Sequence, residues 1–192
     1  MKNLQTRVKT DLATEPVTVA EAKLWCKVTG TEEDSIFTIM VKSAREALEK
    51  YTGCSFAAKG IHSTWLEMPD DNEIELPYGP IISIDAVYKI DEEGAEEALT
   101  LNTDYWVYGD QDAVIKFNTF WSSGVKTQRT VRVEYTAGYG NSSTEELPAS
   151  LKLAVLKQIA TDYEFREDIG AGTVLTNESK KLASPYRKKL WF

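Results

Sequence analysis

The spacing of apolar residues changes twice along this chain of 192 residues, and this change constrains the fold more than any other feature. Between residues 31 and 52, and again between 148 and 167, apolar side chains recur every three or four positions, as on one face of a helix. Between residues 56 and 135 the period becomes two, as in strands with one buried face. This order predicts an α+β protein in which an antiparallel β-unit is inserted into a small helical bundle.

Capping residues set the ends of the first two predicted helices. Thr18 and Glu21 have the spacing of a capping box, which predicts a helix over residues 19–27. Thr31 has the position of an N-cap for the helix over 31–52, and Gly53 suits its left-handed end. The apolar stripe of this second helix is predicted from residues at helical spacing, with Phe37, Val41 and Leu48 beside them: Ile36, Met40, Ala44, Ala47 and Tyr51.

Two further helices are predicted near the C-terminus. Pro148 suits the first turn of a helix whose apolar stripe is Leu151, Val155, Ile159 and Tyr163. Residues 169–173 contain two glycines and predict a flexible break. After it, Ser184 and Pro185 have the positions that start a short terminal helix.

The middle of the chain predicts six strands, separated by turns rich in proline, glycine and aspartate. In residues 82–90, Ile84 and Tyr88 alternate with polar residues, so they are expected on one buried face. Residues 91–94 read as a hairpin turn. The other predicted strands cover residues 60–68, 73–76, 104–108, 113–117 and 130–135.

The predicted elements divide the chain into four segments. Residues 1–55 carry the first helices of the helical body, and residues 56–136 form the inserted β-unit. Residues 137–168 hold the long helix that completes the helical body. Residues 169–192 form a flexible C-terminal arm with a short helix.

Composition excludes several classes of protein. With 30 acidic and 22 basic residues the net charge is −8, which argues against a surface that neutralises DNA phosphates. No run of about 18 apolar residues and no signal peptide occurs, so we expect synthesis in the cytoplasm and no membrane contact. Cys26 and Cys54 lack metal-type spacing and are expected to stay reduced.

The chemistry-bearing residues form no catalytic or metal-binding motif. His62 is the one histidine and has no partner that spacing supplies. Gly138 and Gly140 follow a predicted strand but lack the rest of a dinucleotide motif, so they are interpreted as glycines that relieve backbone strain where the strand turns toward the Pro148 helix. Three acidic clusters are interpreted as solvated turns or a helix start: Asp70–Asp71, Asp91–Glu93 and Glu145–Glu146. The sequence therefore predicts neither an enzyme nor a cofactor.

Three ordered segments resemble the head-tail connector (adaptor) proteins of long-tailed bacteriophages. They are Pro16–Lys23 leading to a helix that ends at Gly53, then Tyr135–Gly140, then the helix that Pro148 begins. The resemblance covers residues 16 to about 167. It implies a connector-like, non-catalytic virion protein that forms a ring of about twelve copies under the portal at the head-tail junction. It also implies that the ring extends the DNA channel without sequence-specific binding and offers a surface to a tail-side connector or stopper protein.

The resemblance also implies roles for charged and aromatic residues. In the connector family the C-terminal arm reaches toward the portal. The arm of this chain has aromatic and basic residues, which are suited to anchoring it in a groove of a partner protein. The basic residues from Lys180 onward fit an acidic partner, although a solvated helix face explains them equally well. The portal-binding candidates are Tyr186, Arg187, Lys188, Lys189, Leu190, Trp191 and Phe192. The candidates for contacts between subunits of the ring are Glu46, Glu49, Lys50, Lys152, Lys157 and Arg166.

Two other functions stay open at this stage. Trp65, Trp106 and Trp121 make the β-region rich in aromatic residues, so a carbohydrate- or ligand-binding β-module of a phage particle is the alternative, with a pocket lined by Trp106 and Trp121. An enzyme that uses the acidic clusters would need two carboxylates that converge in a concave site. Neither spacing nor motif points to such a pair.

Overall fold

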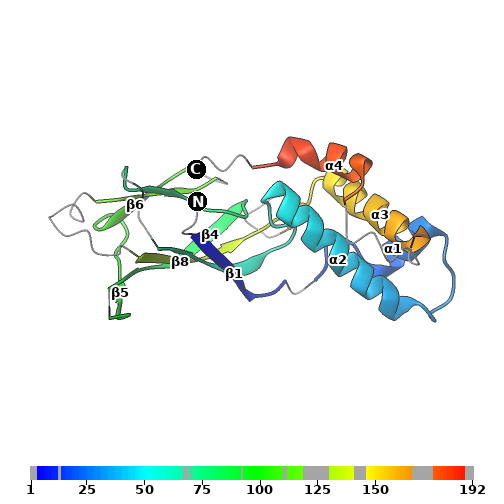
Figure 1. Ribbon diagram of the computed structural model, residues 1–192, viewed down its shortest axis with the longest axis horizontal. Coiled ribbons are helices and arrows are strands. Elements are labelled where there is room, and N and C mark those ends of the chain that lie inside the picture. Colours follow the sequence, from blue (N-terminus) through cyan, green and yellow to red (C-terminus); the bar gives the residue numbers. More distant parts are fainter. Residues whose placement is uncertain are drawn as a thin grey trace.

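The structure is a computed structural model that describes residues 4–12, 14–66, 69, 71–91, 93–109, 112–118, 130–140, 146–165 and 175–188. Helices occupy one end of an elongated molecule and two antiparallel sheets occupy the other (Figure 1). The α+β class is as predicted. However, the molecule is not a helical bundle, because the sheets enclose a second hydrophobic core of their own.

The larger sheet has five strands in the order β1-β2-β8-β4-β5, and every pair in it is antiparallel. The smaller sheet has three strands in the order β3-β7-β6. Buried residues of both sheets, including Ile61, Val133 and Ile115, form the second core. The strands of the larger sheet are β1 (Leu4–Thr10), β2 (Lys59–Trp65), β4 (Ile81–Ile90), β5 (Glu96–Ala98) and β8 (Thr130–Ala137), and those of the smaller sheet are β3 (Glu73–Glu75), β6 (Tyr105–Tyr108) and β7 (Val114–Phe117).

All six predicted strands are present, and β1 and β5 were not predicted. In β1 only Leu4 and Val8 are apolar, and the residues between them on the same strand face and beyond them are threonines, so the alternation is too weakly hydrophobic to mark a buried strand face. The three residues of β5 are all exposed and carry two glutamates, which have low strand propensity. Both are edge strands held by backbone pairing, which leaves little trace in a hydrophobic pattern. Because β1 pairs with β2, residues 4–10 belong to the sheet and not to the helical body.

The predicted faces of β4 are wrong in part. The register of β4 against β8 shifts between Ile81 and Ser83 and again between Ile84 and Ala86. Each irregularity adds one residue and reverses which alternate side chains face the core. Val87 is therefore buried, whereas Tyr88 lies on the other face, with the Arg132 guanidinium 4.7 Å from the centre of its ring.

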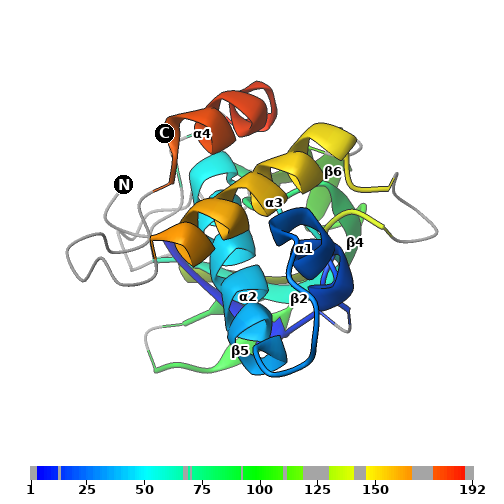
Figure 2. The same ribbon diagram turned by 90° about the vertical axis from the view of Figure 1, so that its right-hand side faces the viewer.

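Four α-helices and a short 3-10 turn make up the helical end. In the view from that end, α3 lies across α2, with α1 and α4 on either side (Figure 2). The helices are α1 (Val19–Cys26), α2 (Asp34–Thr52), α3 (Ala149–Glu164) and α4 (Asn177–Ala183), and the 3-10 turn is Ser184–Tyr186. The helix predicted to start at Ser184 is this single turn, and α4 before it was not predicted.

The structure confirms two of the three predicted caps. The Thr18 hydroxyl accepts from the Glu21 amide at 3.2 Å, and the Glu21 carboxylate accepts from the Thr18 amide at 2.9 Å, which completes the capping box. Gly53 ends α2 with a φ of 71°. The cap at Thr31 is wrong, because α2 begins at Asp34 after Glu33, and Glu33 makes no side-chain capping bond.

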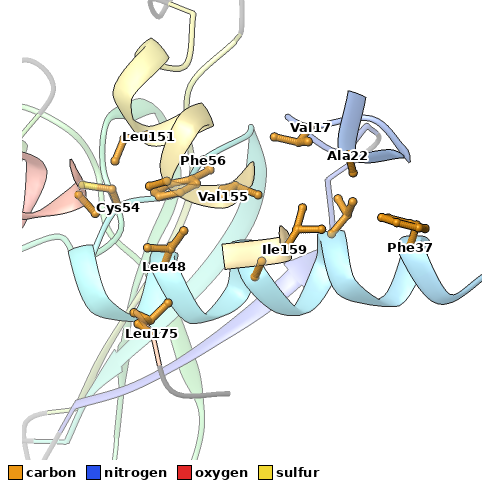
Figure 3. Close-up of a cluster of buried hydrophobic side chains, with 14 residues drawn as sticks. Val17, Ala22, Phe37, Leu48, Cys54, Phe56, Leu151, Val155, Ile159 and Leu175 are labelled. Carbon is orange, nitrogen blue, oxygen red and sulfur yellow. The ribbon is translucent and has the colours of Figure 1, made fainter. Parts of the chain in front are cut away.

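The predicted apolar stripe of α2 is right in part: Ala44 is fully buried, and Met40, Ala47 and Tyr51 pack against the core while partly buried, but the most buried side lies one position further along. Phe37, Val41, Ala44 and Leu48 are buried against α3, whereas Ile36 is 41% exposed (Figure 3). Both stripes have helical spacing, so periodicity alone does not separate them. Packing decides, because the ring of Phe37 stacks on that of Tyr163 from α3, with ring centroids 5.0 Å apart.

Candidate assembly surfaces

A buried ionic cluster joins α2 to the first strand after it. Glu49 is 3% exposed, and its Oε2 accepts from Arg45 Nη1 at 2.8 Å and from Lys59 Nζ at 2.7 Å. Its Oε1 accepts from the Phe56 amide at 2.7 Å. The sequence placed Glu49 among the subunit contacts, but both of its carboxylate oxygens are already bound inside the protomer. A contact with a neighbouring copy would have to break these bonds.

Arg45 is held from two sides in this cluster. Its Nε donates to Glu15 Oε2 at 2.7 Å and its Nη2 donates to Glu15 Oε1 at 3.2 Å. Burial alone would lower the pKa of Arg45, but the hydrogen bonds and charges of Glu15 and Glu49 outweigh it and raise that pKa. The guanidinium therefore stays charged and ties the segment before α1 to the middle of α2.

The other predicted subunit contacts lie on two helices. Glu46 and Lys50 are exposed on the C-terminal half of α2. On α3, Lys152 pairs with Glu21 of α1 at 2.5 Å and Lys157 pairs with Glu178 of α4 at 3.5 Å, so both bind neighbouring helices of the same chain. Arg166 lies outside the described residues.

The first three residues of the predicted portal-binding arm are anchored to the body. The Tyr186 hydroxyl accepts from Ser150 Oγ at 2.9 Å, and the Tyr186 carbonyl accepts from Cys54 Sγ at 3.2 Å. The guanidinium of Arg187 lies 5.4 Å from the centre of the Tyr51 ring. Lys188 follows at the end of α2.

Lys188 is held at both its backbone and its side chain. Its amide donates to the Thr52 carbonyl at 2.8 Å, and its Nζ lies 2.5 Å from Asp112 Oδ1. The predicted acidic partner of this lysine is thus a residue of its own chain. The remaining arm candidates, Lys189, Leu190, Trp191 and Phe192, lie outside the described residues, and they follow a well-fixed attachment point.

The three most exposed large apolar side chains of the described residues lie in helices or directly after one. Leu24 is 80% exposed at the end of α1, and Ile39 is 70% exposed in the second turn of α2. Phe165, directly after α3, is 59% exposed. None of these three side chains is predicted to be exposed, because an apolar residue contributes to a hydrophobic pattern in the same way whether it is exposed or buried.

The described residues considered for catalysis or metal binding do not come together in one site. His62 lies in β2, where its Nε2 is 3.4 Å from Glu134 Oε2. Burial lowers the pKa of His62, although the Glu134 charge opposes that shift. Among the residues that the structure describes, no three histidine, cysteine or acidic side chains form a group able to hold a metal ion.

Only Trp106 of the two residues predicted to line an aromatic pocket lies within the described residues. Trp65 is 6% exposed in the sheet core and Trp106 is half-buried on β6, while Trp121 lies outside the described residues. Of the acidic clusters, Asp91 accepts from the amides of Glu93 and Ala95, which confirms a hairpin turn. Asp70, Glu92 and Glu145 lie outside the described residues. None of the described helices is long and apolar enough to cross a membrane.

The sequence profile of head completion proteins matches residues 15–181. The chain belongs to the head completion protein family. Head completion proteins are structural and non-catalytic, which confirms the resemblance to head-tail connectors and the expectation that this chain is not an enzyme.

Solved structures show the same fold. A chain in the neck of an empty gene transfer agent (GTA) particle, computed with C6 symmetry, is 22% identical with a TM-score of 0.74, and 95% of each chain is covered. A chain of the native GTA virion is 21% identical with a TM-score of 0.73 and the same coverage. A chain of the native GTA neck, computed with C12 symmetry, is 21% identical with a TM-score of 0.65, covering 95% of this chain and 94% of the other. No curated protein sequence matched the chain.

Proposed function

We propose that this head completion protein is a head-tail connector of a phage-like particle. In this role it forms a ring of about twelve copies under the portal, extends the DNA channel and provides the surface to which the tail attaches. The observation that carries the proposal is the family match over residues 15–181, together with a fold shared with chains of GTA necks over 95% of the protein. The particle neck is the proposed location.

The placement of the arm supports a portal contact at the C-terminus. Residues 186–188 are fixed on the end of α2 by contacts to Ser150, Thr52 and Asp112. Beyond this point the sequence Lys189-Leu190-Trp191-Phe192 joins one positive charge to three large apolar side chains. A fixed base lowers the entropy cost of placing a short arm in a partner groove. The portal is the proposed partner of these four residues.

The ring would use surfaces that are not already occupied within one copy. Glu46 and Lys50 remain the best supported of the predicted subunit contacts, because both are exposed on α2 and the ion pairs of Glu46 within the protomer are long, 3.7 Å to Arg45 Nη2 and 4.0 Å to Lys42 Nζ. A ring requires two different surfaces that meet head to tail. The charge of −8 fits a channel wall that repels the DNA backbone and does not bind it.

The test combines the purified protein with the portal protein of the same particle. We expect negative-stain images and mass measurements to show rings, or a stoichiometric layer on the portal. A chain truncated after Lys188 should keep its thermal unfolding midpoint and lose portal binding, because the contacts of residues 186–188 stay intact. Tyr108→Ala, which shortens a side chain that is 54% exposed on β6, is the control and should bind as the full chain does.

Two results would count against the proposal in different ways. A full-length chain that stays monomeric and does not bind the portal would remove the connector function. Full binding by the chain truncated after Lys188 would remove only the role of the arm.

A further inference from the structure

A groove of about 460 Å³ lies between the C-terminal half of α2 and the strands β1 and β2, with β1 at its edge-strand side. Val8, which is 48% exposed, and Arg7 line it from β1, while Glu46 and Lys50 line it from α2. A groove between a strand and a helix is the setting in which proteins bind an extended segment as an added strand.

The backbone of β1 is available for such pairing. In the order β1-β2-β8-β4-β5, β1 lies at one edge of the sheet and pairs only with β2 among the described strands. The row of amide and carbonyl groups on its other side is a template for a further strand. The strand contains no proline that would block pairing.

The groove is positive in a protein that is negative overall. Its lining contains five basic residues and three acidic ones, but Lys9 is paired with Glu134, Arg45 with Glu15 and Glu49, and Lys59 with Glu49, so its positive character comes from the two remaining basic residues. Arg7 and Lys50 form no ion pair with another residue of the described ranges. The basic lining residues are Arg7, Lys9, Arg45, Lys50 and Lys59, and the acidic ones are Asp11, Glu46 and Glu49.

The opposite edge of the same sheet is acidic. There β5 is a three-residue strand whose residues are all exposed, and it contains Glu96 and Glu97. The turn before it adds Asp91 and Glu93, both exposed. Arg132 already binds Glu96 through both of its terminal guanidinium nitrogens. The Glu97 side chain is 73% exposed and lies 4.0 Å from Lys89 Nζ, so Glu93 and Glu97 are the carboxylates best placed to meet another molecule.

We propose that β5 of one copy adds to the free edge of β1 in the next copy, so that neighbouring subunits share one continuous sheet. The carboxylates of Glu93 and Glu97 then face Arg7 and Lys50 across the contact. The two edges belong to opposite ends of one sheet, so the contact is head to tail and repeats from copy to copy, as a ring requires. This inference rests on the proposed connector function and names the contact that builds its ring.

Charge reversal on each edge tests the contact. Arg7→Glu with Lys50→Glu makes the β1 edge negative, and Glu93→Lys with Glu97→Lys makes the β5 edge positive. Each double variant alone should lose the ring, because both of its edges then carry the same sign. An equimolar mixture should restore it, because every edge of one variant then complements the other. Lys181→Glu, exposed on α4, is the control and should assemble as the unchanged protein does.

A cross-link provides a readout that does not depend on reversed charges. A chain that carries Val8→Cys and Glu97→Cys should form a ladder of disulfide-linked multimers when the assembled ring is oxidised. Val8→Cys with Tyr108→Cys should form none, because β6 lies in the other sheet.

Each outcome decides the proposal. Rings from either double variant alone, a folded mixture that stays unassembled, or rings without a disulfide ladder would overturn the shared sheet and leave the connector function standing. A cross-link from Val8→Cys to the portal would assign the groove to a segment of the portal instead. If the unchanged protein forms neither a ring nor a layer on the portal, the connector function fails with it.

Discussion

Arg45 Nη1 donates to Glu49 Oε2 at 2.8 Å, one helical turn along α2, and both side chains are almost fully buried. Lys59 from β2 donates to the same oxygen at 2.7 Å. A charged carboxylate between two cations is thus the link between the main helix and the large sheet. Removing one member of a buried ion cluster leaves the others uncompensated, which costs more than the cluster contributes as a whole.

Glu49→Gln should therefore lower the free energy of unfolding by about 3 to 5 kcal/mol. The amide keeps the shape of the side chain but leaves the positive charges of Arg45 and Lys59 without their shared counterion. Urea unfolding followed by circular dichroism measures the change. The control is Glu46→Gln, a substitution at an exposed position of the same helix, which should change the free energy of unfolding by no more than about 0.5 kcal/mol. Equal effects of the two substitutions would contradict a structural role for Glu49.

The neighbouring residues Phe37 and Ile36 provide a test of which face of α2 is buried. Phe37→Ala should destabilise the protein by about 3 to 5 kcal/mol, because its fully buried ring stacks on Tyr163. Ile36→Ala should cost much less, since 41% of that residue is already exposed to water. Thermal unfolding midpoints of the two variants give the comparison. A larger loss for Ile36→Ala would favour the stripe predicted from the sequence.

Gly138 should tolerate no side chain. Its φ is 137°, and a Cβ added there would lie 2.1 Å from the Ala57 carbonyl oxygen. Gly138→Ala should therefore lower stability by more than about 2 kcal/mol, because backbone must move to relieve the clash. Gly140→Ala is matched to it, since its φ is also positive at 76° but nothing lies within 4 Å of the added atom. It should cost only about 1 kcal/mol. Denaturant midpoints that do not separate the two variants would argue against this close approach.

His62 should make stability depend on pH. Its pKa in the folded protein is lowered from 6.5 by burial, with the charge of Glu134 opposing the shift. Below pH 6.5 the unfolded chain therefore binds a proton that the folded chain resists, and the free energy of unfolding falls as the pH falls through the folded pKa. As the chain has one histidine, His62→Gln should flatten the stability profile from pH 7.5 down to that region. Urea midpoints measured from pH 7.5 to 5.5 test this, and an unchanged slope in the variant would exclude His62 as its source.

The sequence predicted elements best where a local signal marks them. Thr18 and Glu21 form their capping box, Gly53 ends α2, and the strands with a clear period of two are all present. The two missed strands, β1 and β5, are edge strands whose pairing uses backbone atoms that every residue shares. The helix α4 was missed although it has a local signal, an N-cap in which the Thr176 hydroxyl accepts from the Ser179 amide. A contact distant in the chain also supports its start, since the buried side-chain oxygen of Gln158 accepts from the Thr176 amide at 3.0 Å.

For the candidate assembly surfaces, too, the sequence predicts the residue types, whereas burial depends on segments that are distant in the chain. The sequence predicts Glu46 and Glu49 alike as contacts between subunits of the ring, because both are glutamates of one predicted helix. Their difference in burial depends on Arg45 and Lys59, and Lys59 reaches Glu49 only after the chain has turned into β2. Likewise, the groove beside β1 exists only because residues 4–10 pair with β2 and lie next to α2.

From the amino-acid sequence we predict the α+β class, the order of the main elements and the resemblance to head-tail connectors, which the match to the head completion family confirms. These predictions follow from periodicity, capping residues, turns and short ordered segments, which involve residues close together in the chain. Only the folded chain shows which stripe of α2 is buried, which face of β4 meets the core and which charged residues remain exposed. Those outcomes depend on side-chain packing and on the desolvation of charge between segments far apart in the sequence, and no local pattern records either.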